Sequence, residues 1–151
     1  MKTLALLAVL AALLLSPQAH AAYDTPDTPT QSDLSPAIKL IENKNWSDAI
    51  SSLLVYTRAN PNSADGFNLL GYSYRQLKRY DESFAAYNKA LALDPKHRGA
   101  HEYIGEAYIQ LGQLDKAKVH LEALSRICTL SCHEYRDLKK AYEAALAVRR
   151  P

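Results

Sequence analysis

The residues best suited to chemistry are two cysteines and a histidine near the C-terminal end, in the stretch Cys128-Thr-Leu-Ser-Cys132-His133. Cysteines four positions apart on a helix have Cα atoms about 6 Å apart, which is within reach of a disulfide. We therefore expect a disulfide between Cys128 and Cys132. Closing so small a loop would contribute on the order of 2 kcal/mol in the chain-entropy model.

Other uses of these cysteines match the spacing less well. A thiol oxidoreductase normally has two residues between its cysteines, and covalent haem attachment normally needs C-x-x-C-H, whereas three residues intervene here. Metal binding by Cys128, Cys132 and His133 stays open as an alternative, because thiolates and imidazole suit zinc or copper. His101 and His120 are the candidates for a fourth ligand. Apart from this alternative, we expect no metal and no cofactor.

The sequence carries no catalytic constellation. It has no Gly-rich phosphate loop and no G-x-S-x-G turn around a nucleophilic serine. We interpret His97, His101 and His120 as surface or packing residues. The formal net charge is only +2, and nucleic-acid binders usually carry a concentrated basic face. The expectation is a protein that is neither an enzyme nor a nucleic-acid binder.

The N-terminal segment has the three-part pattern of a secretory signal peptide. Lys2 gives a positive start, residues 4–15 are an unbroken apolar run, and Ala19-His20-Ala21 is an A-x-A cleavage signal. The run is shorter than the roughly 20 residues that a membrane-spanning helix needs. We therefore predict a signal peptide over residues 1–21 that is cleaved after Ala21, a periplasmic or secreted protein, and no stable membrane span. An oxidising destination favours the disulfide.

The rest of the chain is organised around an internal repeat of 34 residues. Shifting the sequence by 34 aligns Gly71 with Gly105 and Pro61 with Pro95. Further columns of the repeat bring together residues of similar size. They are Ala49, Ser83 and Ala117; Leu53, Tyr87 and Leu121; and Trp46, Tyr80 and Leu114. A fixed period of this length is typical of stacked structural repeats.

The stretch from Ala64 to His97 resembles the tetratricopeptide repeat family. The family pattern places Trp, Leu, Gly and Tyr in a first helix and Ala, Phe, Ala and Pro in a second. The corresponding residues here are Phe67, Leu70, Gly71, Tyr74, Ser83, Tyr87, Ala90 and Pro95. Gly71 is small, so the second helix of the hairpin can lie close to the first. Pro95 cannot continue a helix and therefore separates two units.

The resemblance implies an all-α fold, a short right-handed α-solenoid of about three helical hairpins plus a C-terminal capping helix. A flexible leader over residues 22–35, rich in Thr, Asp, Pro and Ser, precedes a repeat domain over residues 36–149. The units span about 30–63, 64–97 and 98–131, with the cap at 133–148. The helices expected are 36–44, 46–59, 64–77, 80–93, 98–111, 114–127 and 133–148.

The resemblance also implies a binding surface, because the first helices of stacked hairpins line an inner, concave groove. The groove residues that it implies are Asn68, Tyr72, Arg75, Gln76, Glu102, Glu106, Ile109, Arg136 and Lys140. Members of the family that bind chaperone tails hold two carboxylates with Lys and Asn. Leu34 and Ile38 stand where the first unit would need such polar residues, so that clamp is not expected.

Taken together, these features predict a small exported bacterial scaffold or adaptor that binds a peptide or protein segment in its groove. Two other readings stay open. One is an envelope assembly factor that handles metal or haem through Cys128 and Cys132, and the other is self-association through the hairpin stack. The predicted signal peptide and most of the leader distinguish an exported protein from a cytosolic one, but they do not indicate which partner is bound.

Overall fold

The structure is a computed structural model that describes residues 33–149, and these residues form seven helices and no strands. The predicted signal peptide and the leader up to residue 32 lie outside the described residues. The helices are α1 (Ser35–Glu42), α2 (Trp46–Ala59), α3 (Ala64–Gln76), α4 (Tyr80–Leu93), α5 (Arg98–Gln110), α6 (Leu114–Ile127) and α7 (His133–Arg149). None of the helices in this range is both long enough and apolar enough to cross a membrane.

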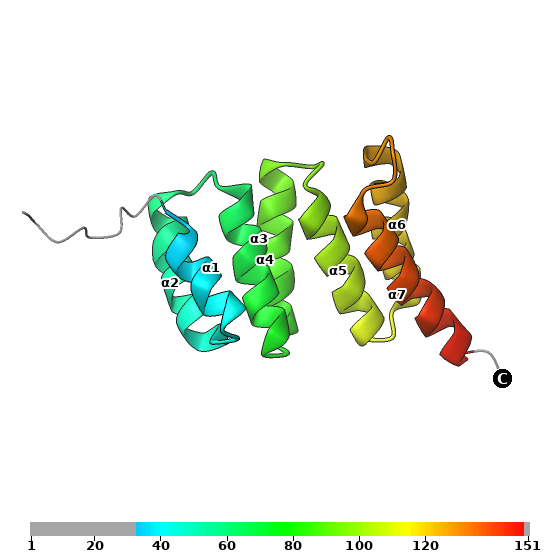
Figure 1. Cartoon of the computed structure of the whole chain (residues 1–151), viewed down its shortest axis with the longest axis horizontal. Coiled ribbons are helices and arrows are strands. Elements are labelled where there is room, and N and C mark those ends of the chain that lie inside the picture. The colour runs from blue at the N-terminus through cyan, green and yellow to red at the C-terminus, as the bar shows by residue number, and fades with distance from the viewer. Residues whose placement is uncertain (1–32, 150–151) are drawn as a thin grey trace, which may run out of the picture.

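The helices pair as three antiparallel hairpins, α1–α2, α3–α4 and α5–α6, which stack in chain order (Figure 1). The last helix, α7, packs against both α5 and α6 and so covers the end of the stack. This arrangement confirms the expected all-α solenoid of about three hairpins with a terminal helix. The expected helix bounds differ from the observed ones by at most two residues.

Local signals explain where the helices begin. The Ser63 side chain accepts a hydrogen bond of 3.1 Å from the Gly66 backbone N–H at the start of α3. His97 does the same for α5, its Nδ1 accepting from the Ala100 N–H at 3.1 Å. These bonds satisfy backbone donors that have no partner within the helix. Asp81 and Glu82 lie in the first turn of α4, where negative charge is favourable.

The loop inside each hairpin repeats the same backbone turn. Lys44, Lys78 and Gly112 have φ angles of 57°, 58° and 69°, and they are spaced 34 residues apart. This left-handed conformation reverses the chain direction after the first helix of each hairpin. Helix α1 consequently ends at Glu42 and not at residue 44 as predicted. The shared turn also shows that the first hairpin belongs to the repeat, although its first helix matches the pattern weakly.

The repeat columns form the core. Ala49, Ser83 and Ala117 are each completely buried. The Ser83 hydroxyl donates a 2.8 Å hydrogen bond to the Gly71 carbonyl, which explains how a polar residue fits in this column. A Cβ atom at Gly71 would lie 2.5 Å from the Tyr87 ring. Only glycine therefore permits this approach of α3 and α4, as predicted from the sequence.

Candidate partner-binding groove

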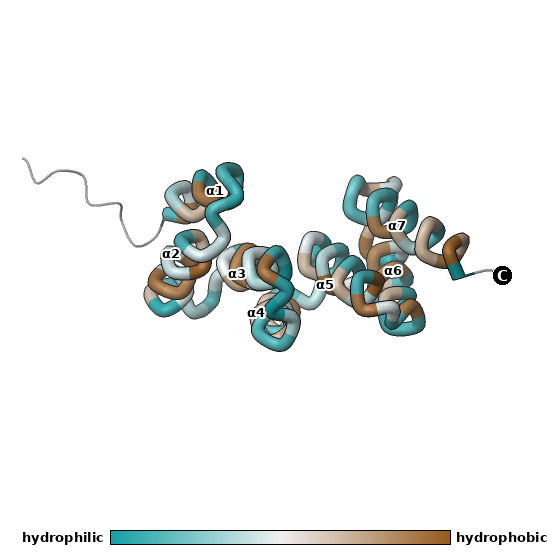
Figure 2. Tube along the Cα trace, turned by 90° about the horizontal axis from the view of Figure 1, so that it is seen from below, coloured by the Kyte–Doolittle hydropathy of each residue, from teal (hydrophilic) through white to brown (hydrophobic). Residues whose placement is uncertain are grey.

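The stack is curved, and alternate helices lie on opposite sides of it. Figure 2 shows α1, α3, α5 and α7 along one side, with α1 and α7 rising at the two ends above α3 and α5. Helices α2, α4 and α6 lie on the other side. The concave side is thus built from the first helix of each hairpin and the terminal helix.

An arginine held between two aromatic rings lies in the centre of this concave side. The Arg75 guanidinium is 5.4 Å from the centre of the Tyr72 ring and 5.5 Å from the centre of the Tyr103 ring. It also forms a 2.8 Å ion pair with Glu106. Arg75 is 6% exposed. Its charge is therefore already satisfied within the protein by a carboxylate and two π faces.

The groove residues expected from the sequence differ widely in exposure. Asn68, Arg75 and Glu102 are at most 7% exposed and form the floor of the groove. Tyr72, Glu106 and Ile109 are half-buried, and the exposed ones are Gln76, Arg136 and Lys140. The sequence pattern places all of them on one helix face, but burial and pairing divide them. Arg75 and Glu106 in particular bind each other and are not two independent contacts for a partner.

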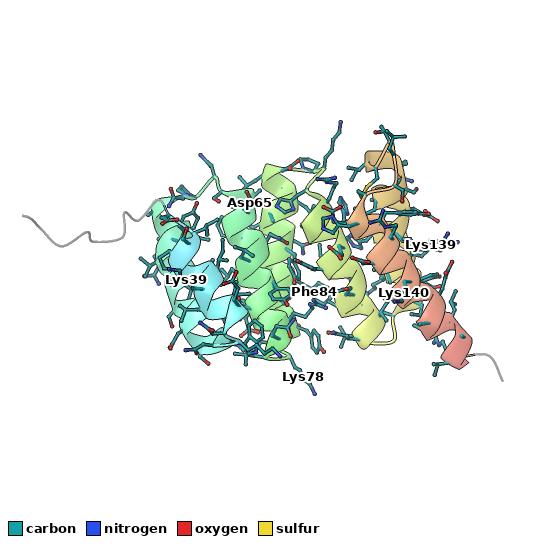
Figure 3. All side chains as sticks on the ribbon, in the orientation of Figure 1. Lys39, Asp65, Lys78, Phe84, Lys139 and Lys140 are labelled. Atoms are coloured by element: carbon teal, nitrogen blue, oxygen red, sulfur yellow. A yellow bond between two sulfur atoms is a disulfide. The ribbon has the colours of Figure 1, made fainter. Side chains whose placement is uncertain are left out.

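A pocket of 380 Å³ lies where the N-terminal ends of α5 and α7 meet α3. Its walls combine charged and aromatic residues from these helices and the α4–α5 loop. They are Asp65, Asp94, Lys96, His97, Arg98, Gly99, Glu102, Tyr103, His133 and Glu134. Figure 3 places Asp65 at the end of α3 that forms this rim, and Lys78 at the opposite end of the hairpin.

The Glu102 carboxyl group is the most perturbed acid of the pocket. Burial, followed by the negative charges of Glu106, Asp137 and Glu134, raises its pKa to about 7, and the Arg75 charge opposes this only weakly. Burial also raises the pKa of Tyr103 to about 12. Glu102 is thus poised between its neutral and charged forms near neutral pH.

Two pocket residues, Tyr103 and Glu134, were not identified from the sequence. Glu134 is 7% exposed and its carboxylate lies 3.4 Å from Arg98. Tyr103 lies next to the groove position Glu102 in the chain, and its ring packs 5.0 Å from that of Tyr72. The repeat pattern gave no sign of either, because both depend on contacts between helices of different units.

The two cysteines are bonded to each other in the structure. The S–S distance is 1.97 Å and the Cα atoms are 5.6 Å apart. The bridge spans the segment between α6 and α7, where a staple for the terminal helix was expected. His133 points its Nδ1 toward Glu134 at 3.4 Å and not toward the sulfurs. Within residues 33–149, no three His, Cys, Asp or Glu side chains form a group that could hold a metal.

A pair of histidines lies between α5 and α6, outside the concave side. The Nδ1 atoms of His101 and His120 are 3.0 Å apart, and His101 Nε2 lies 3.1 Å from the Pro95 carbonyl oxygen. Burial, and then the His101 charge, lowers the pKa of His120 to about 4, while burial lowers that of His101. Both rings therefore act as neutral packing groups near pH 7, as the sequence suggested.

Comparison with known proteins agrees with this geometry. The tetratricopeptide repeat family matches residues 64–97 and, through a second description of the same repeat, residues 85–125. Over 88 residues the chain is 32% identical to Tetratricopeptide repeat protein 1 of Schizosaccharomyces pombe. The match covers 58% of this chain but only 8% of that protein.

Solved structures share the fold. The TPR2B domain of yeast Sti1, in a complex with Hsp70, has a TM-score of 0.69 at 20% identity, covering 75% of this chain and 92% of that domain. The Yersinia enterocolitica type III secretion translocator chaperone SycD has a TM-score of 0.69 at 17% identity, covering 76% and 81%. The chain therefore contains tetratricopeptide repeats, and residues 33–149 have the fold of that repeat family.

Proposed function

We propose that the protein is a non-enzymatic scaffold or adaptor that binds a peptide or protein segment in its concave groove. The observation that carries this proposal is the groove itself, a curved face whose floor is rigidly packed and whose walls mix aromatic, apolar and charged groups. Such a surface suits an extended or helical segment better than a small metabolite. Two of the similar structures, from yeast Sti1 and SycD, are described as binding or chaperoning other proteins.

The bound segment differs from a chaperone tail held by two carboxylates. Leu34 precedes α1, and Ile38 on α1 is 39% exposed, so this end of the groove offers apolar groups where a carboxylate clamp needs cations. The Arg75 guanidinium is occupied by Glu106. We therefore infer that the partner does not present a free acidic C-terminus to this site.

We further propose that this binding takes place outside the cytoplasm, in the periplasm or after secretion. The support is the N-terminal pattern of residues 1–21 and the Cys128–Cys132 pair at bonding distance. Disulfides persist in oxidising compartments and are rare in the cytosol.

The groove is best tested at Ile109, because a change at the buried Arg75 would disturb packing as well as binding. The variant Ile109→Glu introduces a charge on the groove side of α5. The matched control, Val119→Glu, introduces the same charge at a residue of α6 that is 59% exposed. Tagged wild-type and variant proteins are used to capture partners from an envelope extract, and the captured proteins are compared by mass spectrometry.

We expect Ile109→Glu to lose most captured partners and Val119→Glu to retain them, with unchanged helicity in both. Equal capture by the two variants would refute binding in the groove. If wild-type protein captures only copies of itself, and light scattering shows a dimer, the stack serves self-association and the adaptor proposal is wrong.

A further inference from the structure

The Glu102 carboxylate is buried and has no partner of opposite charge. It is 7% exposed and lines the 380 Å³ pocket between α3, α5 and α7. Within the described residues it makes no hydrogen bond and no ion pair. A buried carboxylate without such a partner is costly, so its presence calls for an explanation.

The neighbouring carboxylate on the same helix face shows what is missing. Glu106 lies one turn further along α5 and is paired at 2.8 Å with Arg75, whose guanidinium lies between two tyrosine rings. Glu102 has the same type of surroundings, with Tyr103 beside it in the pocket wall. It lacks only the cation that Arg75 supplies to Glu106.

The charges around Glu102 do not supply that cation. On α7, Glu134 and Asp137 add negative charge, and Glu106 on α5 does the same. The nearby Arg98 is 3.4 Å from Glu134, and Arg75 is held by Glu106.

The histidines of the pocket are also engaged elsewhere. His97 lies 3.0 Å from Asp65, and His133 lies 3.4 Å from Glu134. The pocket as a whole therefore has excess negative potential centred on Glu102.

We propose that this pocket receives a lysine or arginine side chain of the segment bound in the groove, and that Glu102 pairs with its charged group. The inference rests on the proposed function and names the chemistry that the bound segment must carry. A volume of 380 Å³ lies within the range of about 300–1,000 Å³ that is usual for ligand pockets. The Tyr103 ring next to the carboxylate supplies a π face for the same cation.

The experiment selects binders from a displayed library of random twelve-residue peptides against the disulfide-bonded protein. The peptides enriched on wild type are synthesised, and their affinities for wild type, Glu102→Gln and Glu122→Gln are measured by fluorescence polarisation. Glu122→Gln is the matched control, since its side chain is 53% exposed on α6 and pairs only with Lys118. Ile109→Glu is included to report on the groove as a whole.

The expected result is a basic residue at one shared peptide position. Replacing it by norleucine, or replacing Glu102 by Gln, should weaken binding about tenfold or more, as for the loss of a buried charged partner. Glu122→Gln should bind like wild type. Affinity for wild type should also rise from pH 6 to pH 8, because Glu102 must lose its proton to pair with the cation. In Glu102→Gln this rise should disappear.

Two outcomes overturn the inference, and they are distinguishable. If peptides bind wild type and fail on Ile109→Glu but show no basic position and no loss on Glu102→Gln, the groove binds segments and the Glu102 assignment is wrong. If no peptide binds wild type more tightly than Ile109→Glu, the proposed function fails together with the inference. A melting temperature for Glu102→Gln at or above that of wild type shows that weaker binding does not come from misfolding.

Discussion

At the scale of single residues, the contacts of the glycines and small residues set how closely the helices approach. Gly71 contacts the Tyr87 ring of the same hairpin. The equivalent Gly105 instead contacts Leu138 of α7, to which a Cβ atom would come within 2.5 Å. The same repeat position therefore serves a close contact within one hairpin and a contact with the terminal helix in the next.

This close contact predicts that Gly71→Leu destabilises the protein. The larger side chain would overlap Tyr87, and overpacking of this kind costs about 1–3 kcal/mol. Thermal unfolding followed by circular dichroism measures the effect. The control is Ala144→Leu, which adds the same side chain at an exposed position of α7. An unchanged melting temperature in Gly71→Leu would mean that α3 and α4 do not rely on glycine for their approach.

The histidine pair predicts a loss of stability in acid. The pKa of His120 is about 4 in the folded protein, against about 6.5 when unfolded. The unfolded chain therefore binds more protons between these values, so stability is present above pH 6.5 and is lost as pH falls toward 4. From this histidine the loss is roughly 2–3 kcal/mol.

Chemical denaturation between pH 4 and pH 7.5 measures this effect. The variant His120→Gln should have a smaller change in unfolding free energy over that range. His133→Gln is the control, because the His133 side chain is 69% exposed, and it should behave like wild type. A pH dependence in His120→Gln as steep as in wild type would exclude His120 as its source.

At the scale of elements, the terminal helix α7 completes the apolar surface that α5 and α6 leave open. Leu138 is fully buried and contacts Gly105, and the Cys128–Cys132 bridge ties the start of α7 to the end of α6. The helix also brings Glu134 to the pocket. It therefore protects the end of the stack, as terminal repeats must, and forms one wall of the candidate site.

We predict that Leu138→Ala destabilises the protein by about 2–5 kcal/mol, because it leaves a cavity between α5 and α7. The control is Leu130→Ala, at a residue that is 92% exposed. Hydrogen exchange should show that amides of α7 lose protection first in Leu138→Ala. If both variants unfold at the same denaturant concentration, α7 is not packed as the structure indicates.

At the scale of the whole molecule, curvature creates a concave side that no single hairpin has. The neighbours α3 and α5 come from different units, and α7 closes the far end. The pocket around Glu102 takes residues from these three helices and the α4–α5 loop. Binding is therefore a property of the stack, and loss of any one hairpin would remove part of the site.

Export also belongs to this scale and can be tested on the intact chain. We predict that protein secreted by a bacterial host starts at Ala22 and has a mass two hydrogens below that of the reduced chain 22–151. Intact-mass spectrometry before and after reduction measures both quantities. A retained segment 1–21 would contradict the cleavage site, and two free thiols or bound metal would contradict the disulfide.

The amino-acid sequence by itself determined the repeat, the positions of the helices and the small residues at their crossings. These features depend on contacts and conformations that recur within each unit, so a period of 34 residues reveals them. The groove face was also predictable, because it follows from helix periodicity. The sequence did not show that Arg75 and Glu106 pair with each other, or that Tyr103 and Glu134 line a pocket.

Only the tertiary structure decided those features, because each joins residues of different hairpins. The distance between Arg75 and Glu106 depends on how α5 stacks on α3, and the burial of Glu102 depends on where α7 docks. The local pattern is the same whether such a residue ends up paired, exposed or buried alone. The chain thus encodes its hairpins locally, while the charge of its candidate site arises from their packing.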